Sequence, residues 1–156
     1  MKHTIQALVE NKFGVLARIA SLFSARGYNI ASLAVGETQD PTVSCMTIVV
    51  NAQDEGILEQ IKKQLHKLID VVTVIDFTRR EYIDRELILV KLKKDKKQLD
   101  LGKLAKNKSV RVIEDKKDYK IIEICADRSQ IEDIFKNLKK FKIKELVRTG
   151  KIAMGK

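Results

Sequence analysis

The chain has 156 residues, of which 44 % are hydrophobic and 33 % charged, and 31 Lys and Arg against 21 Asp and Glu leave a net charge of +10 at pH 7. This length suits one ordinary domain or two small ones, and so much apolar material excludes a disordered chain. No apolar run approaches the ~18 residues of a membrane span, and the first residues do not resemble a signal peptide. Because Cys45 and Cys125 lack a C-x-x-C spacing, we expect reduced thiols and a cytoplasmic protein.

The charge is divided unevenly along the chain. Residues 1–78 carry 7 Lys and Arg and 8 Asp and Glu, a net charge of −1, which leaves 24 and 13, a net charge of +11, for residues 79–156. This change predicts two domains, 1–78 and 79–156. A basic second half is typical of a partner that is a nucleic acid or an acidic protein surface.

Hydrophobic periodicity predicts a βαββαβ order in the first domain. Apolar residues at helical spacing after Gly14 predict a helix that ends at Gly27, and Asp54 is expected to cap a second helix. The expected strands are 3–9, 29–35, Val43–Asn51 and 71–77. This order is typical of a ferredoxin-like α+β domain.

The second domain is predicted to repeat this order without repeating the sequence. Strands are expected over 86–92, 110–113, 121–126 and 143–147, with a short lysine-rich helix over 95–105. Ser129 and Glu132 have the spacing of a capping box and predict the start of the last helix. The C-terminal tail is expected to begin at Thr149.

Catalytic and metal-binding patterns are weak in this sequence. The two histidines, His3 and His66, have no partner at metal-ligand spacing, and each cysteine alternates with apolar residues as in a buried strand. We expect neither a catalytic site nor a metal site in this chain.

One segment has the chemistry of a ligand site. Residues 11–16 join a strand to the N-terminus of a helix, where free backbone N–H groups attract an anion. Gly14 would let a ligand approach the backbone, and the Asn11 amide offers both a donor and an acceptor. This combination suits the carboxylate and ammonium groups of an amino acid. On these residues alone, an ordinary helix cap with a turn glycine is the favoured explanation.

Three stretches resemble a known family. Residues 10–36 (ENKFGVLARIASLFSARGYNIASLAVG) resemble an ACT domain, and more closely that of the acetolactate (acetohydroxyacid) synthase small regulatory subunits. Residues 85–91 (RELILVK) and 145–154 (ELVRTGKIAM) are similar to the C-terminal domain of the same family. The family usually has proline where this chain has Phe13.

The resemblance implies a non-catalytic regulatory subunit in the biosynthesis of valine, leucine and isoleucine. It would activate a separate large catalytic subunit, which carries thiamine diphosphate, Mg²⁺ and FAD, and make that subunit sensitive to feedback inhibition by valine or another branched-chain amino acid. This chain would hold no cofactor itself. It would form a homodimer through its ACT domains, with the effector bound between subunits.

The resemblance also implies which residues bind the effector. The loop of one subunit would contribute Asn11, Phe13, Gly14, Val15 and Leu16. The other subunit would contribute Asn29 and Ile30.

A second hypothesis joins an ACT sensor to a basic nucleic-acid-binding domain. The expected central strands of the second half, 86–92 and 121–126, contain no aromatic residue for stacking on bases. Acidic residues also interrupt the lysines, and no helix-turn-helix is recognisable. We therefore expect no nucleic-acid partner.

Overall fold

The computed structural model describes residues 2–52, 55–94 and 109–156, and it contains two compact units. Unit 1 comprises Met1–Ile83 together with Lys151–Lys156, and unit 2 comprises Asp84–Gly150. The division therefore falls between Ile83 and Asp84 rather than after residue 78. It also returns the last six residues to the first unit, because these residues form a strand there.

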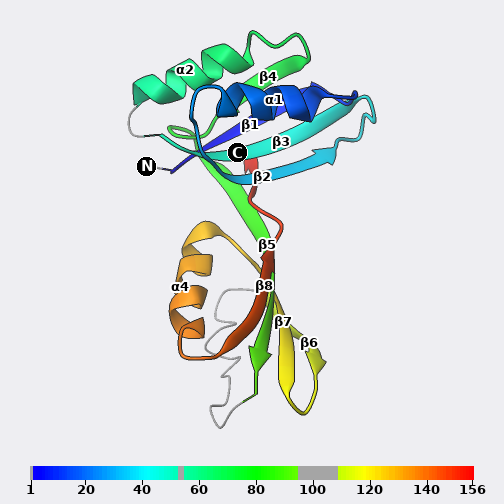
Figure 1. Ribbon diagram of the computed structural model, residues 1–156, viewed down its shortest axis with the longest axis vertical. Helices are drawn as coiled ribbons and strands as arrows, with labels where there is room; N and C mark the ends of the chain where they lie inside the picture. The colour runs from blue at the N-terminus through cyan, green and yellow to red at the C-terminus, as the bar shows by residue number, and fades with distance from the viewer. Residues whose placement is uncertain (1, 53–54, 95–108) are drawn as a thin grey trace. The chain divides into compact units, whose positions relative to one another are not determined.

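Unit 1 has the predicted ferredoxin-like α+β arrangement. Two helices cover one face of a four-stranded antiparallel sheet with the strand order β2-β3-β1-β4 (Figure 1). Its elements are β1 (Lys2–Glu10), α1 (Val15–Ser24), β2 (Ile30–Glu37), β3 (Val43–Asn51), α2 (Glu55–Leu65) and β4 (Val71–Asp76). In this order β2 and β4 are the edge strands. The capping role expected of Asp54 lies outside the described residues.

Alternation along β1 builds the core of unit 1. Ile5, Ala7 and Val9 point to the helix-covered face and are at most 1 % exposed. They pack in one cluster with Ile19 and Phe23 of α1, and with the buried face of α2. Helix α1 ends because Gly27 takes a φ of +67°, a left-handed conformation that favours glycine. The Gly27 and Tyr28 N–H groups donate to Ser24 and Phe23, 3.0 Å each, which closes a Schellman motif.

Unit 2 repeats the sheet order of unit 1. Its strands lie in the order β6-β7-β5-β8, again antiparallel, with α4 packed against the sheet (Figure 1). The elements are β5 (Tyr82–Lys93), whose first two residues belong to unit 1, β6 (Ser109–Asp115), β7 (Tyr119–Ala126), α4 (Arg128–Leu138) and β8 (Ile143–Arg148). The helix expected over 95–105 lies outside the described residues.

The predicted capping box of α4 is wrong by two residues. Asp127 is the N-cap, and its carboxylate accepts a hydrogen bond from the Gln130 N–H (2.9 Å) while the Gln130 side chain accepts one from the Asp127 N–H (3.1 Å). Ser129 instead donates to Asp127, and Glu132 pairs with Arg128 one turn away. Strand β7 ends at Ala126, so the chain can only turn into the helix at Asp127.

The tail that begins at Thr149 contains a strand. Strand β9 (Ile152–Gly155) pairs with β5, and the Lys156 N–H donates to the Glu81 carbonyl (3.2 Å). Within unit 1, the Gln6 side chain donates to the Ala153 carbonyl (2.9 Å). Since Gln6 alternates with the core residues of β1, β9 lies on the sheet face opposite the helices.

Candidate functional site

The loop between β1 and α1 is built by one glycine. Gly14 is the N-cap of α1 with a φ of 80° and provides no side-chain cap. A residue with a Cβ atom would be strained at this φ, and that atom would lie 3.0 Å from Nη1 of Arg18. Gly14 therefore leaves the end of the helix open to a ligand.

Two backbone amides are available at this helix start. The Arg18 N–H donates to the Gly14 carbonyl (2.9 Å), the first regular bond of the helix. Within residues 2–52, 55–94 and 109–156, the N–H groups of Leu16 and Ala17 have no acceptor. Together with the positive end of the helix dipole, they form a place for a carboxylate.

Asn11 is held firmly beside this helix start. Its backbone N–H donates to Thr42 (2.7 Å), and its side-chain amide donates to the Glu37 carboxylate and the Pro41 carbonyl, 2.9 Å each. Both side-chain donors are therefore used, which leaves Oδ1 as an acceptor. The sequence pattern suggested a donor and an acceptor, whereas the structure leaves Asn11 oxygen-rich and adds the Glu37 carboxylate next to it.

Glu37 is a candidate site residue that sequence reasoning missed. It is the last residue of β2 and lies 26 positions from Asn11, so only the pairing of β2 with β3 brings the two together. A carboxylate and an amide oxygen side by side suit an ammonium group. The signal available in the sequence was an acidic residue at the end of a predicted strand, which is too common to identify a site.

The other predicted residues of the loop have different roles. Val15 is 3 % exposed and belongs to the core, so it can offer a ligand only its backbone. Phe13 is completely exposed, and Leu16 is about half exposed. The bulky ring thus points into solvent in a single chain.

Asn29 and Ile30 lie at the far end of the sheet from this loop. Strand β3 pairs with Glu10 at Val43 and with Ile30 at Val50. Seven residues of extended strand between these positions span about 23 Å. Asn29 is exposed and Ile30 is half-buried against the core. One chain therefore cannot bring the two halves of the predicted site together.

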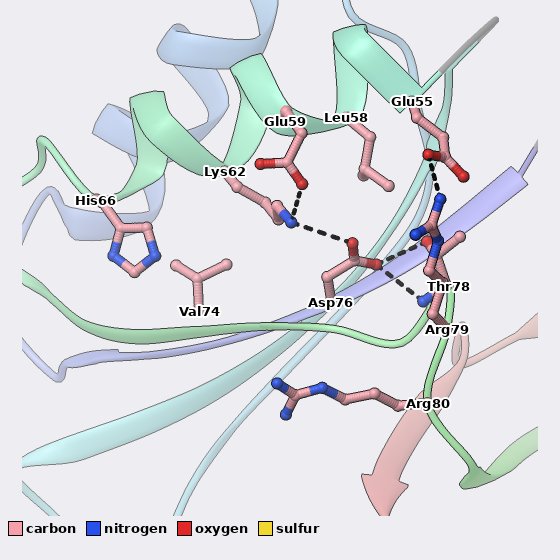
Figure 2. A pocket seen from close by; sticks show the side chains of 10 residues that line it. All are labelled: Glu55, Leu58, Glu59, Lys62, His66, Val74, Asp76, Thr78, Arg79 and Arg80. Atoms are coloured by element: carbon pink, nitrogen blue, oxygen red, sulfur yellow. Dashed lines mark hydrogen bonds and ion pairs between the residues drawn. The ribbon is translucent and has the colours of Figure 1, made fainter.

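A second candidate is a pocket of about 360 Å³ between α2 and the chain after β4 (Figure 2). Lys62 contacts the carboxylates of Glu59 and Asp76, and Arg79 pairs with Glu55 (2.6 Å). Each carboxylate that lines the pocket is thus paired with a neighbouring cation, and Lys62 is shared by two of them. These pairs stabilise the turn that follows β4, and we assign no ligand to the pocket.

Asp76 anchors that turn. Burial alone would raise the pKa of the Asp76 carboxyl, but hydrogen bonds from the Thr78 hydroxyl (2.7 Å) and N–H (2.9 Å), and from Lys62, outweigh burial and lower it. The Thr78 hydroxyl also lies 3.0 Å from Nδ1 of the buried His3. Since that hydroxyl donates to Asp76, His3 donates to it through Nδ1–H. This places His3 in a structural network.

The described residues contain no group of three His, Cys, Asp or Glu side chains that could hold a metal ion. Over the same part of the chain, no helix is both long and apolar enough to cross a membrane.

Comparisons with known proteins cover almost the whole chain. Residues 5–73 match the family described as "AHAS small subunit-like ACT domain", and residues 85–156 match "Small subunit of acetolactate synthase". The chain belongs to the acetolactate synthase small-subunit family.

Individual relatives agree with this family. A probable acetolactate synthase small subunit from Archaeoglobus fulgidus is 43 % identical over 99 % of this chain and 96 % of its own length. A small subunit from Mycobacterium leprae is 41 % identical over 99 % and 91 %. The crystal structure of the Thermotoga maritima acetolactate synthase small subunit matches with a TM-score of 0.85 and 35 % identity over 100 % of this chain and 98 % of that one. The family name implies a catalytic subunit as partner, and it favours this interpretation over a nucleic-acid-binding regulator.

Proposed function

We propose that this chain is the regulatory subunit of acetolactate synthase, which activates the catalytic subunit in the cytoplasm and makes it sensitive to valine or another branched-chain amino acid. The observation that carries this proposal is the candidate site of this chain, which belongs to the family. There, two free amides at the start of α1 lie beside the oxygen atoms of Asn11 and Glu37. An amino acid needs this combination of donors and acceptors.

Each group of valine would have a partner in this site. Its carboxylate would accept hydrogen bonds from the Leu16 and Ala17 N–H groups, and its ammonium would face Asn11 Oδ1 and Glu37. The isopropyl group then needs an apolar neighbour. Val15 is buried in its own core, so this chain offers only the exposed Phe13 and Leu16, and a second subunit would supply a further apolar neighbour.

Antiparallel pairing of β2 with β2 of a second copy supplies this neighbour. β2 is an edge strand with unpaired backbone groups on its outer side, and a two-fold axis near its centre would place Ile30 of one copy opposite Glu37 of the other. Glu37 binds Asn11 directly. The loop of residues 11–16 in one copy would therefore lie beside Ile30 of the other copy. Residues that lie about 23 Å apart in one chain would thus share one site in a homodimer.

Such a shared site is a physical basis for regulation. An effector that contacts both subunits favours the arrangement in which the two halves are correctly placed, and it shifts the population only by this difference in affinity. Thiamine diphosphate, Mg²⁺ and FAD would be held by the catalytic subunit, and this chain would contribute no reacting group.

The proposal is tested by titration and reconstitution. Calorimetry of the purified chain should give saturable binding of L-valine and none of D-valine. Mixing the chain with the acetolactate synthase catalytic subunit of the same organism should raise the rate of acetolactate formation, and L-valine should lower that rate again. Failure to activate the catalytic subunit, or turnover of pyruvate by this chain alone, would overturn the proposal.

A further inference from the structure

Two large apolar side chains of unit 1 are completely exposed on neighbouring loops. Phe13, in the loop before α1, is 102 % exposed, and Ile69, in the loop before β4, is 96 % exposed. Leu16 and Val72, three residues further along each segment, are 47 % and 62 % exposed. We call these four residues the Phe13–Ile69 surface. Exposed apolar groups of this size mark an interaction site when they gather on one surface.

The two loops are fixed to each other. The Glu10 N–H donates to the Asp70 carbonyl (2.8 Å), and Arg18 Nε donates to the Asp70 carboxylate (2.8 Å). Asp70 is only 7 % exposed, so this ion pair is partly protected from water. The loops that carry Phe13 and Ile69 are therefore held in place before any partner binds, which lowers the entropy lost on binding.

The proposed homodimer leaves the Ile69 end of this surface uncovered. Ile69 directly precedes β4, and β4 is the edge strand opposite β2 in the order β2-β3-β1-β4. Three strand spacings separate the two edges, about 14 Å. A second copy paired through β2 thus lies at the other edge of the sheet.

The surface is also continuous with the proposed effector site. Phe13 and Leu16 flank Gly14, and the Leu16 N–H is one of the two free amides at the start of α1. A protein that covers Phe13 would therefore sense a ligand bound at this helix start. For a regulatory subunit, the protein that has to respond to the effector is the catalytic subunit.

We propose that the Phe13–Ile69 surface docks into an apolar pocket of the acetolactate synthase catalytic subunit. The inference rests on the proposed function, and it names the surface through which this chain would contact the catalytic subunit. A single phenylalanine buries about 150–250 Å² in such a pocket, so Phe13 and Ile69 together form the centre of a standard interface of about 800 Å² per partner. Centres of this kind contribute most of the affinity.

The test compares variants of the full-length chain in binding to the catalytic subunit. Ile69→Ser is the main variant, because Ile69 lies outside the effector loop, and Phe13→Ser and the double variant complete the series. Met154→Ser is the matched control, since Met154 is 72 % exposed in the same unit but belongs to β9. All the substituted positions are exposed, so the substitutions should change stability little.

We expect Ile69→Ser to raise the Kd for the catalytic subunit at least tenfold, which corresponds to about 1.4 kcal/mol, and the double variant to raise it further. Met154→Ser should stay within twofold of the parent chain, and Ile69→Ser should bind L-valine with unchanged affinity. A double variant that binds the catalytic subunit within twofold of the parent overturns the docking surface but leaves the proposed function standing. A parent chain that does not bind the catalytic subunit overturns the proposed function itself.

Discussion

Substitution of Gly14 by aspartate tests the effector site most directly. It places a carboxylate at the position where the carboxylate of valine is expected, beside the free amides of Leu16 and Ala17. The matched control is Gly14→Asn, because asparagine has nearly the same shape, tolerates a left-handed φ about as well as aspartate, and carries no charge.

The structure gives the size of each effect. Both variants have to adopt the Gly14 φ of 80°, at a cost of about 1–2 kcal/mol in folding stability. Their Cβ atom would lie 3.0 Å from the guanidinium of Arg18, which is the flexible end of a half-exposed side chain and can shift. The strain is common to both variants, so their comparison isolates the charge.

Two like charges about 4 Å apart repel by about 1 kcal/mol in water and about 4 kcal/mol at an effective dielectric constant of 20. The Kd for L-valine should therefore be about 5-fold to several hundred-fold higher for Gly14→Asp than for Gly14→Asn. Calorimetry with L-valine measures this ratio, D-valine serves as the ligand control, and thermal unfolding confirms that both variants fold. Equal affinities of the two variants would show that the carboxylate of the effector lies elsewhere.

Three further predictions address the partner's half of the site and the stability of each unit. Asn29→Ala should raise the Kd for L-valine about fivefold, the effect of one lost hydrogen bond, and an unchanged Kd would contradict a shared site. Asp76→Asn should lower the free energy of unfolding by about 1–2 kcal/mol at pH 7. Because hydrogen bonds from Thr78 lower the folded-state pKa of Asp76, this contribution is complete above the unfolded-state pKa of about 3.9 and disappears as the pH falls through the lower folded value. Urea unfolding from pH 7 to pH 3 should show that the difference in free energy of unfolding between the parent chain and Asp76→Asn becomes smaller. A difference independent of pH would refute the role assigned to the Asp76 carboxylate. Arg148→Ala should destabilise unit 2 by about 2–3 kcal/mol, because Glu86 is 8 % exposed and loses both hydrogen bonds from the guanidinium (2.6 and 2.7 Å); a loss below about 0.5 kcal/mol in urea unfolding would mean that the pair behaves as a surface pair.

Elements that depend on neighbours along the chain were predictable. Strand β3 lies at Val43–Asn51 as expected, since a run of β-branched residues specifies a buried strand. Helix α1 ends in a motif closed by Gly27, and glycine is the residue type that adopts this left-handed φ most readily. The resemblance of residues 10–36 to the family is confirmed for the same reason, because that motif is one continuous run of sequence.

Local patterns failed where two of them competed. Asp127 with Gln130 and Ser129 with Glu132 both have capping-box spacing, and the end of β7 at Ala126 selects the first pair. Strand β9 was missed because four residues carry too weak a pattern. It exists because β5 offers it a pairing partner and Gln6 offers it a hydrogen bond across the sheet.

The candidate site divides in the same way. Residues 11–16 combine a helix start with Gly14 and Asn11, and the sequence specifies this combination because it depends on adjacent residues. Tertiary structure is needed to bring Glu37 to Asn11 and to separate Asn29 and Ile30 from them by about 23 Å, because strand pairing sets those distances. Sheet register relates residues far apart in sequence, and no local hydrogen bond or hydrophobic period records it.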